Sequence, residues 1–199
     1  MEGLIPYITE PREDTGLTNG KIGIWLFLAS EVMLFGAFFA TYIVMRLGAE
    51  TWPRGWDAQN VPLGTVNTGV LITSSVTMVM AWASLERSDL KKFQMFGAAT
   101  VALGFVFLII KYFEYTSHFH EDMWPRTSTY LAVYFTMTGL HALHVIFGMA
   151  VNGYFTLTGK SYWEGGDRQL LINRVENAGL FWHFVDIVWI FLFPVLYLL

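Results

Sequence analysis

The sequence predicts an all-α fold, an integral membrane bundle of five transmembrane helices, on three observations. First, 54% of the 199 residues are hydrophobic, only 14% are charged, and the mean hydropathy is +0.45. These values are far from those of an ordinary water-soluble domain. Second, five apolar stretches are each long enough to cross a hydrocarbon layer of about 30 Å. Third, the connections between these stretches carry proline, glycine and charge, which are typical of loops outside a bilayer.

The five predicted spans cover about residues 22–45, 65–84, 93–115, 129–157 and 177–199. Residues 1–21 form a polar tail, and we expect residues 22–199 to form one transmembrane domain without a soluble domain. The tail lacks the basic segment and short apolar core of a cleaved signal peptide, so the first span is expected to remain in the mature protein. The fourth stretch is the longest, which predicts a helix that tilts or extends past the bilayer.

Basic residues are distributed unevenly between the two sides of the predicted bundle. The tail, the second loop and the fourth loop hold Arg12, Lys21, Arg87, Lys91, Lys92, Lys160, Arg168 and Arg174. The first and third loops hold only Arg46, Arg54 and Arg126. The excess of positive charge predicts that the N-terminus is cytoplasmic and the C-terminus periplasmic.

The first span contains a carboxyl, Glu31, about nine residues from its start, or roughly 14 Å along the helix. A carboxyl at that depth is expected to be protonated, hydrogen-bonded or in contact with water. Glu31 is therefore either a residue that handles protons or binds a partner, or a neutral carboxylic acid with a structural role. Small residues that favour close helix packing recur along the same span: Gly23, Ser30, Ala37 and Thr41.

The second and third spans also carry residues that favour contact with other helices. The second is rich in hydroxyl and amide groups: Thr65, Asn67, Thr68, Thr73, Ser74, Ser75 and Thr77. In the third, Gly97, Gly104 and Lys111 follow one another at seven-residue steps. Lys111 lies one turn from Glu114 near the outer end, so either these two form an ion pair or the lysine extends to the interface.

Ionisable residues lie on one face of each of the last two spans. The fourth carries His141 and His144, followed by Gly148 and Asn152. In the fifth, Glu176, Gly179, His183, Asp186 and Ile190 follow 3-4-3-4 spacing and share a face. Buried His and Asp cost several kcal/mol in a bilayer unless they are paired or line a cavity. We expect an interhelical polar network, in the same layer as Glu31, made of His141, His144, Glu176, His183 and Asp186.

Little in the sequence points to catalysis within this chain. Two histidines and a carboxylate could bind a metal, but such residues more often hydrogen-bond between helices, so no metal site is predicted. No nucleophile with an oriented base and no phosphate-binding loop is present, so no catalytic residue is assigned. The absence of cysteine excludes disulfides and thiolate metal sites, and the net charge of −4 gives no reason to expect nucleic-acid binding.

Five stretches in order resemble subunit III of the haem–copper terminal oxidases, in the short five-helix form found in many bacteria. They are IWLFLASEVMLFGAFFA (24–40), PLGTVNTGVLITSS (62–75), LGFVFLIIKYFEY (103–115), TGLHALHVIFG (138–148) and FWHFVDIVWIFLF (181–193). The last two stretches are the most specific to the family.

The resemblance implies a multi-pass subunit of the bacterial inner membrane that takes part in aerobic respiratory electron transport without redox centres of its own. Haem and copper would then lie in partner subunits I and II, and a small subunit IV or a larger supercomplex would be further partners. The subunit would pack on subunit I, protect it from inactivation during turnover and support proton uptake. By the same resemblance, Glu31 corresponds to the family's membrane carboxyl, and His141, His144, Glu176, His183 and Asp186 to its interhelical polar residues.

The longer form of the family binds phospholipids in a cleft between its first two helices and the remaining five. This chain lacks those two helices, so a bound phospholipid would need another site or a small subunit in their place. The segment SEVMLFG around Glu31 is closer to the cytochrome c oxidases than to the quinol oxidases. Three alternatives stay open: a quinol oxidase subunit III, a homologue associated with nitric oxide reductase, and an autonomous proton or metal transporter.

Overall fold

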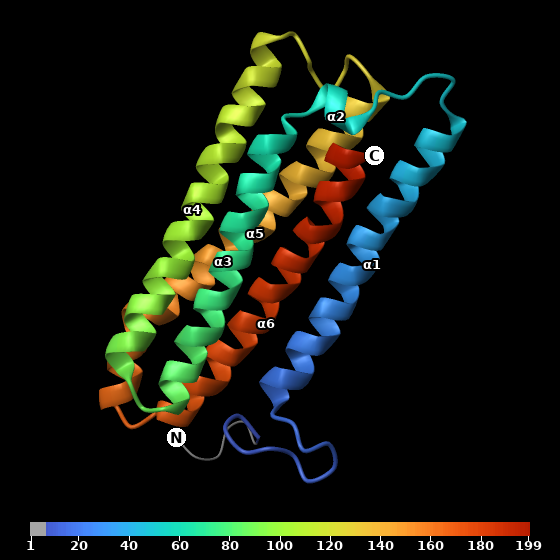
Figure 1. Ribbon diagram of the computed structural model, residues 1–199. Coiled ribbons are helices and arrows are strands. Elements are labelled where there is room, and N and C mark those ends of the chain that lie inside the picture. The colour runs from blue at the N-terminus through green and yellow to red at the C-terminus, as the bar shows by residue number, and fades with distance from the viewer. Residues whose placement is uncertain (1–6) are drawn as a thin grey trace.

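The computed structural model describes residues 7–199, and within this range all regular structure is helical (Figure 1). The helices are α1 (Asn19–Gly48), α2 (Gly55–Ala58), α3 (Val61–Glu86), α4 (Leu90–His120), α5 (Thr129–Glu164) and α6 (Arg168–Phe193). The chain continues from α6 into a single π-helical turn, η1 (Pro194–Leu198). Five of these helices are long and apolar enough to cross a membrane, and the last of these spans includes η1.

Side-chain caps fix where most of the long helices begin. Thr18 accepts a hydrogen bond from the Lys21 amide, and Asn60, Asp89 and Ser128 do the same at the starts of α3, α4 and α5. Each cap satisfies one of the backbone N–H groups that have no partner within the helix. Because these caps lie in the polar flanks, the helices extend several residues beyond the apolar stretches.

The helices depart most from the predicted spans around α6 and in the first loop. The last helix begins at Arg168, well before the predicted start at residue 177, because its first turns are polar and lie beyond the apolar stretch. The short helix α2 was not predicted. At the other end of α6, Pro194 lacks the N–H that would continue the α-helical hydrogen bonds, and the chain widens there into η1.

Helices α3 to α6 form the body of the bundle, and α1 lies at its edge (Figure 1). α3 packs against α4 and α6, and α5 packs against α4 and α6, so the four helices close into a ring of neighbours. α1 packs mainly against α6, with a smaller contact to α5. As a result α6 is the most buried of the five spans and α1 the least.

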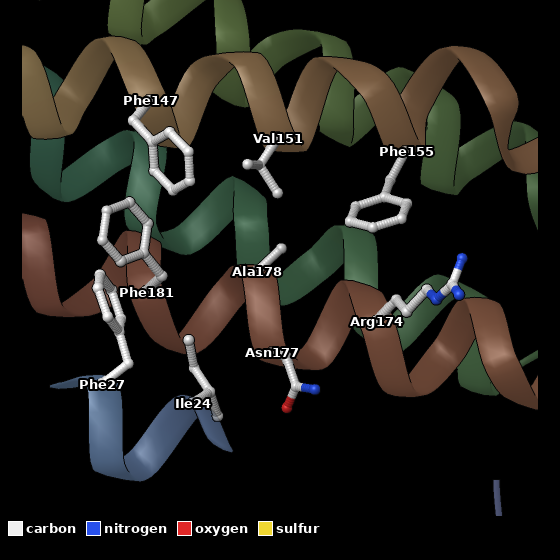
Figure 2. A pocket seen from close by; sticks show the side chains of 9 residues that line it. All are labelled: Ile24, Phe27, Phe147, Val151, Phe155, Arg174, Asn177, Ala178 and Phe181. Atoms are coloured by element: carbon white, nitrogen blue, oxygen red, sulfur yellow. The ribbon is translucent and has the colours of Figure 1, made fainter. Parts of the chain in front are cut away.

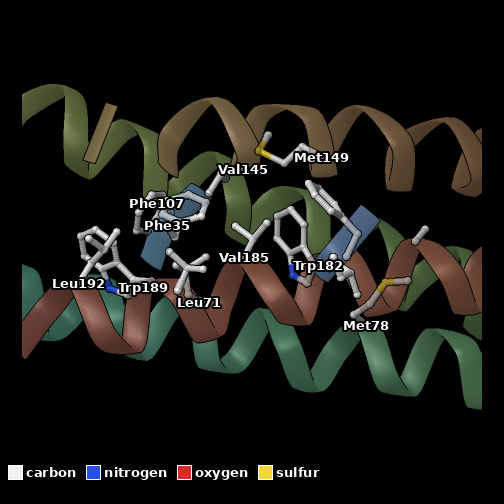
Figure 3. Close-up of a cluster of buried hydrophobic side chains, with 14 of the residues drawn as sticks. Phe35, Leu71, Met78, Phe107, Val145, Met149, Trp182, Val185, Trp189 and Leu192 are labelled. Atoms are coloured by element: carbon white, nitrogen blue, oxygen red, sulfur yellow. The ribbon is translucent and has the colours of Figure 1, made fainter. Parts of the chain in front are cut away.

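The core lies between α3, α4, α5 and α6 and centres on two tryptophans of α6, Trp182 and Trp189, which are fully buried (Figure 3). Both indole N–H groups donate to hydroxyls of α3, Trp182 to Ser74 and Trp189 to Thr68. These bonds place the two largest side chains of the core without leaving either indole N–H unpaired.

Two glycines make room for Trp182. A Cβ atom at Gly148 of α5 would lie 2.7 Å from its ring, and one at Gly104 of α4 would lie 2.8 Å from the Met149 side chain and 3.1 Å from the ring. The glycines predicted to favour packing in the third span therefore do face the core. The small residues of the first span do not, because Gly23, Ser30, Ala37 and Thr41 are exposed on the outside of the bundle.

Candidate functional site

Glu31 of α1 and His144 of α5 form a polar contact between the edge helix and the body. The imidazole Nε2 lies 2.9 Å from Oε2 of the carboxyl, and the two side chains are only 15% and 13% exposed. His144 Nδ1 lies 2.8 Å from the Leu140 carbonyl, which can only accept, so Nδ1 carries a proton. The pair is then neutral overall in two ways, as imidazole with carboxylic acid or as imidazolium with carboxylate. In either form the two groups share a proton along one hydrogen bond.

Glu176 of α6 is paired with Lys21 of α1 rather than with a histidine. Lys21 Nζ lies 2.5 Å from Glu176 Oε1, and both side chains are about 30% exposed. The pair lies at the end of the bundle where α1 and α6 begin. It ties the edge helix to α6 about two to three turns from the Glu31–His144 contact.

His183 and Asp186 of α6 both lie against α3. His183 Nδ1 is 2.6 Å from the Ser75 hydroxyl. Asp186 is only 3% exposed and lies beside the same serine, yet neither carboxyl oxygen has a hydrogen-bond partner among residues 7–199. The Ser75 hydroxyl is therefore bonded to His183, and the Asp186 carboxyl is left without a hydrogen bond of good geometry.

His141 of α5 is fully buried, and within the described part of the chain neither ring nitrogen has a hydrogen-bond partner. Its ring centre lies 5.5 Å from that of Phe107 and 5.2 Å from that of Trp189. Within the described residues His141 is therefore held by packing that includes these two aromatic rings, and not by hydrogen bonds.

The five residues predicted to form one polar network are separated in the structure. None of His141, His144, Glu176, His183 and Asp186 is hydrogen-bonded to another of the five. The bonds that they make go to α1, to α3 or to the carbonyl one turn earlier. The residue spacing predicted which side chains share a face of each helix. It could not predict which neighbouring helix that face contacts.

Lys111 and Glu114 of α4 form a buried ion pair near the opposite end of the bundle. Lys111 Nζ donates to Glu114 Oε2 at 3.0 Å, to the Tyr134 hydroxyl at 3.0 Å and to the Tyr197 hydroxyl at 2.8 Å. The two tyrosines in turn donate to Glu114 Oε1, at 3.0 and 2.5 Å. The side chains of the ion pair are only 5% and 2% exposed, so the lysine does not extend to the interface.

Aromatic rings complete the surroundings of the lysine. Its Nζ lies 5.1–5.5 Å from the ring centres of Tyr115, Tyr134, Trp189 and Tyr197. Buried charges are tolerated when they are paired and fully hydrogen-bonded, and this lysine meets both conditions. The network joins α4, α5 and η1.

Three further bonds hold the C-terminal turn, and none was predicted from the sequence. The Tyr42 hydroxyl donates to the Val195 carbonyl at 3.0 Å, and the Tyr130 hydroxyl donates to the Leu196 carbonyl at 2.8 Å. Arg46 Nη2 donates to the Leu199 carbonyl at 2.9 Å. These bonds satisfy carbonyls at the end of a helix, where partners within the helix are missing.

A cavity of about 410 Å³ opens between α1, α5 and α6 (Figure 2). Its walls are apolar and aromatic, and Phe27, Phe147 and Phe181 gather at one end of the view. Among the described residues that line it, the polar ones are Arg174, at the other end of the view, and Asn177, nearer the middle. Phe27 and Phe147 are each one helical turn from the Glu31–His144 pair, so the aromatic end of the cavity adjoins that pair.

Residues 7–199 contain no group of three or more His, Cys, Asp or Glu side chains placed to share a metal ion. The two histidines of α5 and His183 of α6 have separate surroundings, as described above, so the donor set of the metal alternative is not assembled.

The comparisons with known proteins agree on one family. The sequence profile described as "Cytochrome c oxidase subunit III" matches residues 12–199. The chain is 34% identical to cytochrome c oxidase subunit 3 of Bacillus sp. (strain PS3), over 91% of this chain and 86% of the relative. It is 32% identical to cytochrome bo(3) ubiquinol oxidase subunit 3 of Pseudomonas aeruginosa, over 91% and 85%.

A third relative is a fused protein, the haem–copper oxidase subunit I+III of Aeropyrum pernix. The chain is 30% identical to it over 89% of this chain, which corresponds to 22% of the fused protein. The family match covers all of the described helices, the three relatives are 30–34% identical, and the fold has the five spans that the resemblance implied. The chain belongs to the cytochrome c oxidase subunit III family and is therefore a membrane-embedded subunit of a haem–copper oxidase.

Proposed function

We propose that this chain is the non-redox structural and modulatory subunit of a proton-pumping cytochrome c oxidase. In this role it packs on subunit I, stabilises it during turnover and supports proton uptake from the cytoplasmic side. Haem and copper belong to the partner subunits. The observation that carries the proposal is the family match over residues 12–199, together with a relative in which this subunit is fused to subunit I.

The distribution of charge supports an orientation with the N-terminus in the cytoplasm. The starts of α1, α4 and α6 and the ends of α3 and α5 lie at one end of the bundle (Figure 1). The basic residues of the tail, of the second loop and of the fourth loop therefore gather at that end. This is the arrangement that the positive-inside rule associates with the cytoplasmic side.

The Glu31–His144 pair supports a role in handling protons. It lies about 12 residues into α1, roughly 18 Å from the proposed cytoplasmic end. A largely buried carboxyl–imidazole pair can shift a proton between its two groups without changing its net charge, which suits a site near a proton-uptake path. Glu31 also joins α1 to the body, so the pair is at once a structural contact and a proton-sharing one.

The cavity between α1, α5 and α6 supports a bound phospholipid. Its apolar walls fit an acyl chain, and Arg174 at one end offers a cation to a phosphate (Figure 2). This site does not require the two additional helices of the longer family form.

A quinol oxidase is the second candidate, because one relative in this range of identity is a ubiquinol oxidase subunit. The electron donor binds to other subunits of such complexes. The segment SEVMLFG around Glu31 favours the cytochrome c branch, and the donor site has to be read from the partner chains.

Purification of the tagged chain in a mild detergent tests the proposal. Mass spectrometry should find subunits I and II, and visible spectra should show haem bands. A cytochrome c-binding copper domain in subunit II would support the cytochrome c branch, whereas its absence would favour the quinol branch. A colourless chain without partners, from a detergent in which a known oxidase stays intact, would contradict the proposal.

A further inference from the structure

One face of α6 is left uncovered, although α6 is the most buried helix of the bundle. Ile187 lies four residues after His183, and Ile190 and Phe191 lie three and four residues after Ile187, so the four share this face, which we call the α6 outer face. Ile187, Ile190 and Phe191 are all exposed, and His183 is half-buried at the edge of the face. α3 lies to one side of α6 and α1 to the other (Figure 1), and α1 and α3 have at most a marginal contact with each other.

The free nitrogen of His183 distinguishes this face. Its Nδ1 is bonded to Ser75, which leaves Nε2 without a hydrogen-bond partner among residues 7–199. Five exposed hydroxyls within the spans each donate to a carbonyl of their own helix and so need no outside partner: Ser30, Thr41, Thr65, Thr73 and Thr136.

The depth of His183 in the membrane limits which groups can form a hydrogen bond with its Nε2. It lies seven residues, or roughly 10 Å along the axis, beyond the Lys21–Glu176 ion pair. At this depth the surroundings are hydrocarbon, and an acyl chain cannot form a hydrogen bond. Phospholipid head groups lie at the interface and do not reach it. The group that completes His183 must therefore come from protein that itself crosses the membrane.

We infer that the α6 outer face is the docking surface for a transmembrane helix of subunit I that presents a hydrogen-bonding side chain to His183 Nε2. The inference rests on the proposed function, since it takes subunit I as the neighbour. The fused subunit I+III relative supports that choice, because in that protein the two subunits are parts of one chain. Apolar side chains around a single polar contact are what helix pairing in a bilayer uses.

Photo-crosslinking in the intact oxidase tests the docking surface. We would place p-benzoylphenylalanine at Phe191, which is 59% exposed on the α6 outer face, or at Phe105, which is 55% exposed on α4. The probe at position 191 is expected to give an adduct with a transmembrane segment of subunit I, and the matched probe at position 105 to give none. Adducts of position 191 with lipid only, or with a different subunit, would overturn the inference. Adducts of position 105 but not 191 would overturn it as well.

Two substitutions separate the contact of His183 with a partner from its contact with Ser75. His183→Leu removes both bonds and is expected to lower the subunit III retained per haem after detergent washing by about fivefold. Ser75→Ala removes only the internal bond and should retain close to the wild-type amount. Equal losses from the two variants would show that His183 acts within this chain alone and would overturn the inference.

The outcomes also distinguish this inference from the proposed function. If wild-type chain fails to co-purify with subunit I, the proposed function fails and the docking surface fails with it. If the chain co-purifies but the probe at position 191 reaches only lipid, the proposed function stands and the docking surface alone is wrong.

Discussion

At the scale of single residues, the polar side chains of this membrane protein differ in how well they are satisfied. Glu31 and His144 are hydrogen-bonded to each other, and Lys111 donates to three residues, Glu114, Tyr134 and Tyr197. His141 has no hydrogen-bond partner among the described residues although it is fully buried. A polar residue whose hydrogen bonds are made within the chain contributes to the stability of the fold. One whose hydrogen bonds are not made there either lowers that stability or is bonded by another subunit in the assembled complex.

Glu31→Gln tests the proton-sharing role of its pair with His144. Glutamine keeps an acceptor and a donor at nearly the same place but cannot exchange a proton with the imidazole. We expect unchanged assembly and haem content, with slower proton uptake or faster inactivation during turnover. The measurements are oxygen consumption over successive turnovers and stopped-flow proton uptake by the purified complex. If both match wild type, Glu31 is a packing residue only.

His141→Leu tests whether the buried histidine is a cost to the fold. Leucine removes the two unpaired ring nitrogens and fills the site with an apolar side chain. The free energy of unfolding should therefore stay unchanged or rise by about 1 kcal/mol. The measurement is the midpoint of thermal unfolding of the detergent-solubilised complex, followed by loss of helical circular dichroism. A fall by several degrees would mean that His141 has a partner in the assembled protein.

At the scale of elements, two structures organise the packing of the helices. One is the core of α6 tryptophans, which needs the close approach of α4 and α5 at Gly104 and Gly148. The other is the buried network of Lys111, Glu114, Tyr134 and Tyr197, which fastens the C-terminal turn to α4 and α5. The first works by shape and the second by complementary charge, so they should respond differently to substitution.

The ion pair predicts non-additive effects. Lys111→Met leaves the Glu114 carboxyl buried without its cation and should destabilise the subunit by about 3 kcal/mol. The double variant Lys111→Met, Glu114→Gln removes both charges and should cost clearly less than the single one. Unfolding in a mixed-detergent titration of the wild type, both singles and the double gives the coupling. Additive losses would mean that the two charges do not interact.

The glycines predict an effect of shape. Gly148→Leu would force a side chain into the Trp182 ring and should cost about 1–3 kcal/mol by overpacking. Gly36→Leu on the exposed side of α1 is the matched control, since a Cβ there meets nothing within 4 Å. Yield of folded subunit in the complex is the measurement, and equal yields from the two variants would argue against the close packing described for α5 and α6.

At the scale of the whole molecule, the sequence predicted the five spans and their family, because length and apolar content decide whether a helix can cross a bilayer. It missed the early start of α6, since Arg168 and its neighbours form helix outside the apolar stretch. It also could not choose Ser75 as the partner of His183, or Tyr197 as a partner of Lys111. Such pairs depend on which helices are neighbours in space, and the spacing of residues along one helix does not determine its neighbours.

The same limit explains the small residues of α1. Gly23, Ser30 and Ala37 follow a spacing that favours helix packing, yet they face away from the bundle. A pattern of small residues shows that a face can be approached closely, but not by what. In this chain the body of the bundle lies on the other side of α1, where Leu28, Phe35 and Tyr42 are buried.

The central claim is that this subunit protects and supports the catalytic subunit without redox chemistry of its own. Its most direct test is oxygen consumption by the purified oxidase with the subunit present, after its removal in detergent, and after it is added back. The account predicts an unchanged initial rate per haem at saturating donor, followed by faster loss of activity in the depleted enzyme, with recovery on reconstitution. Equal lifetimes of the depleted and complete enzymes, with spectra that show intact haem in both, would contradict it.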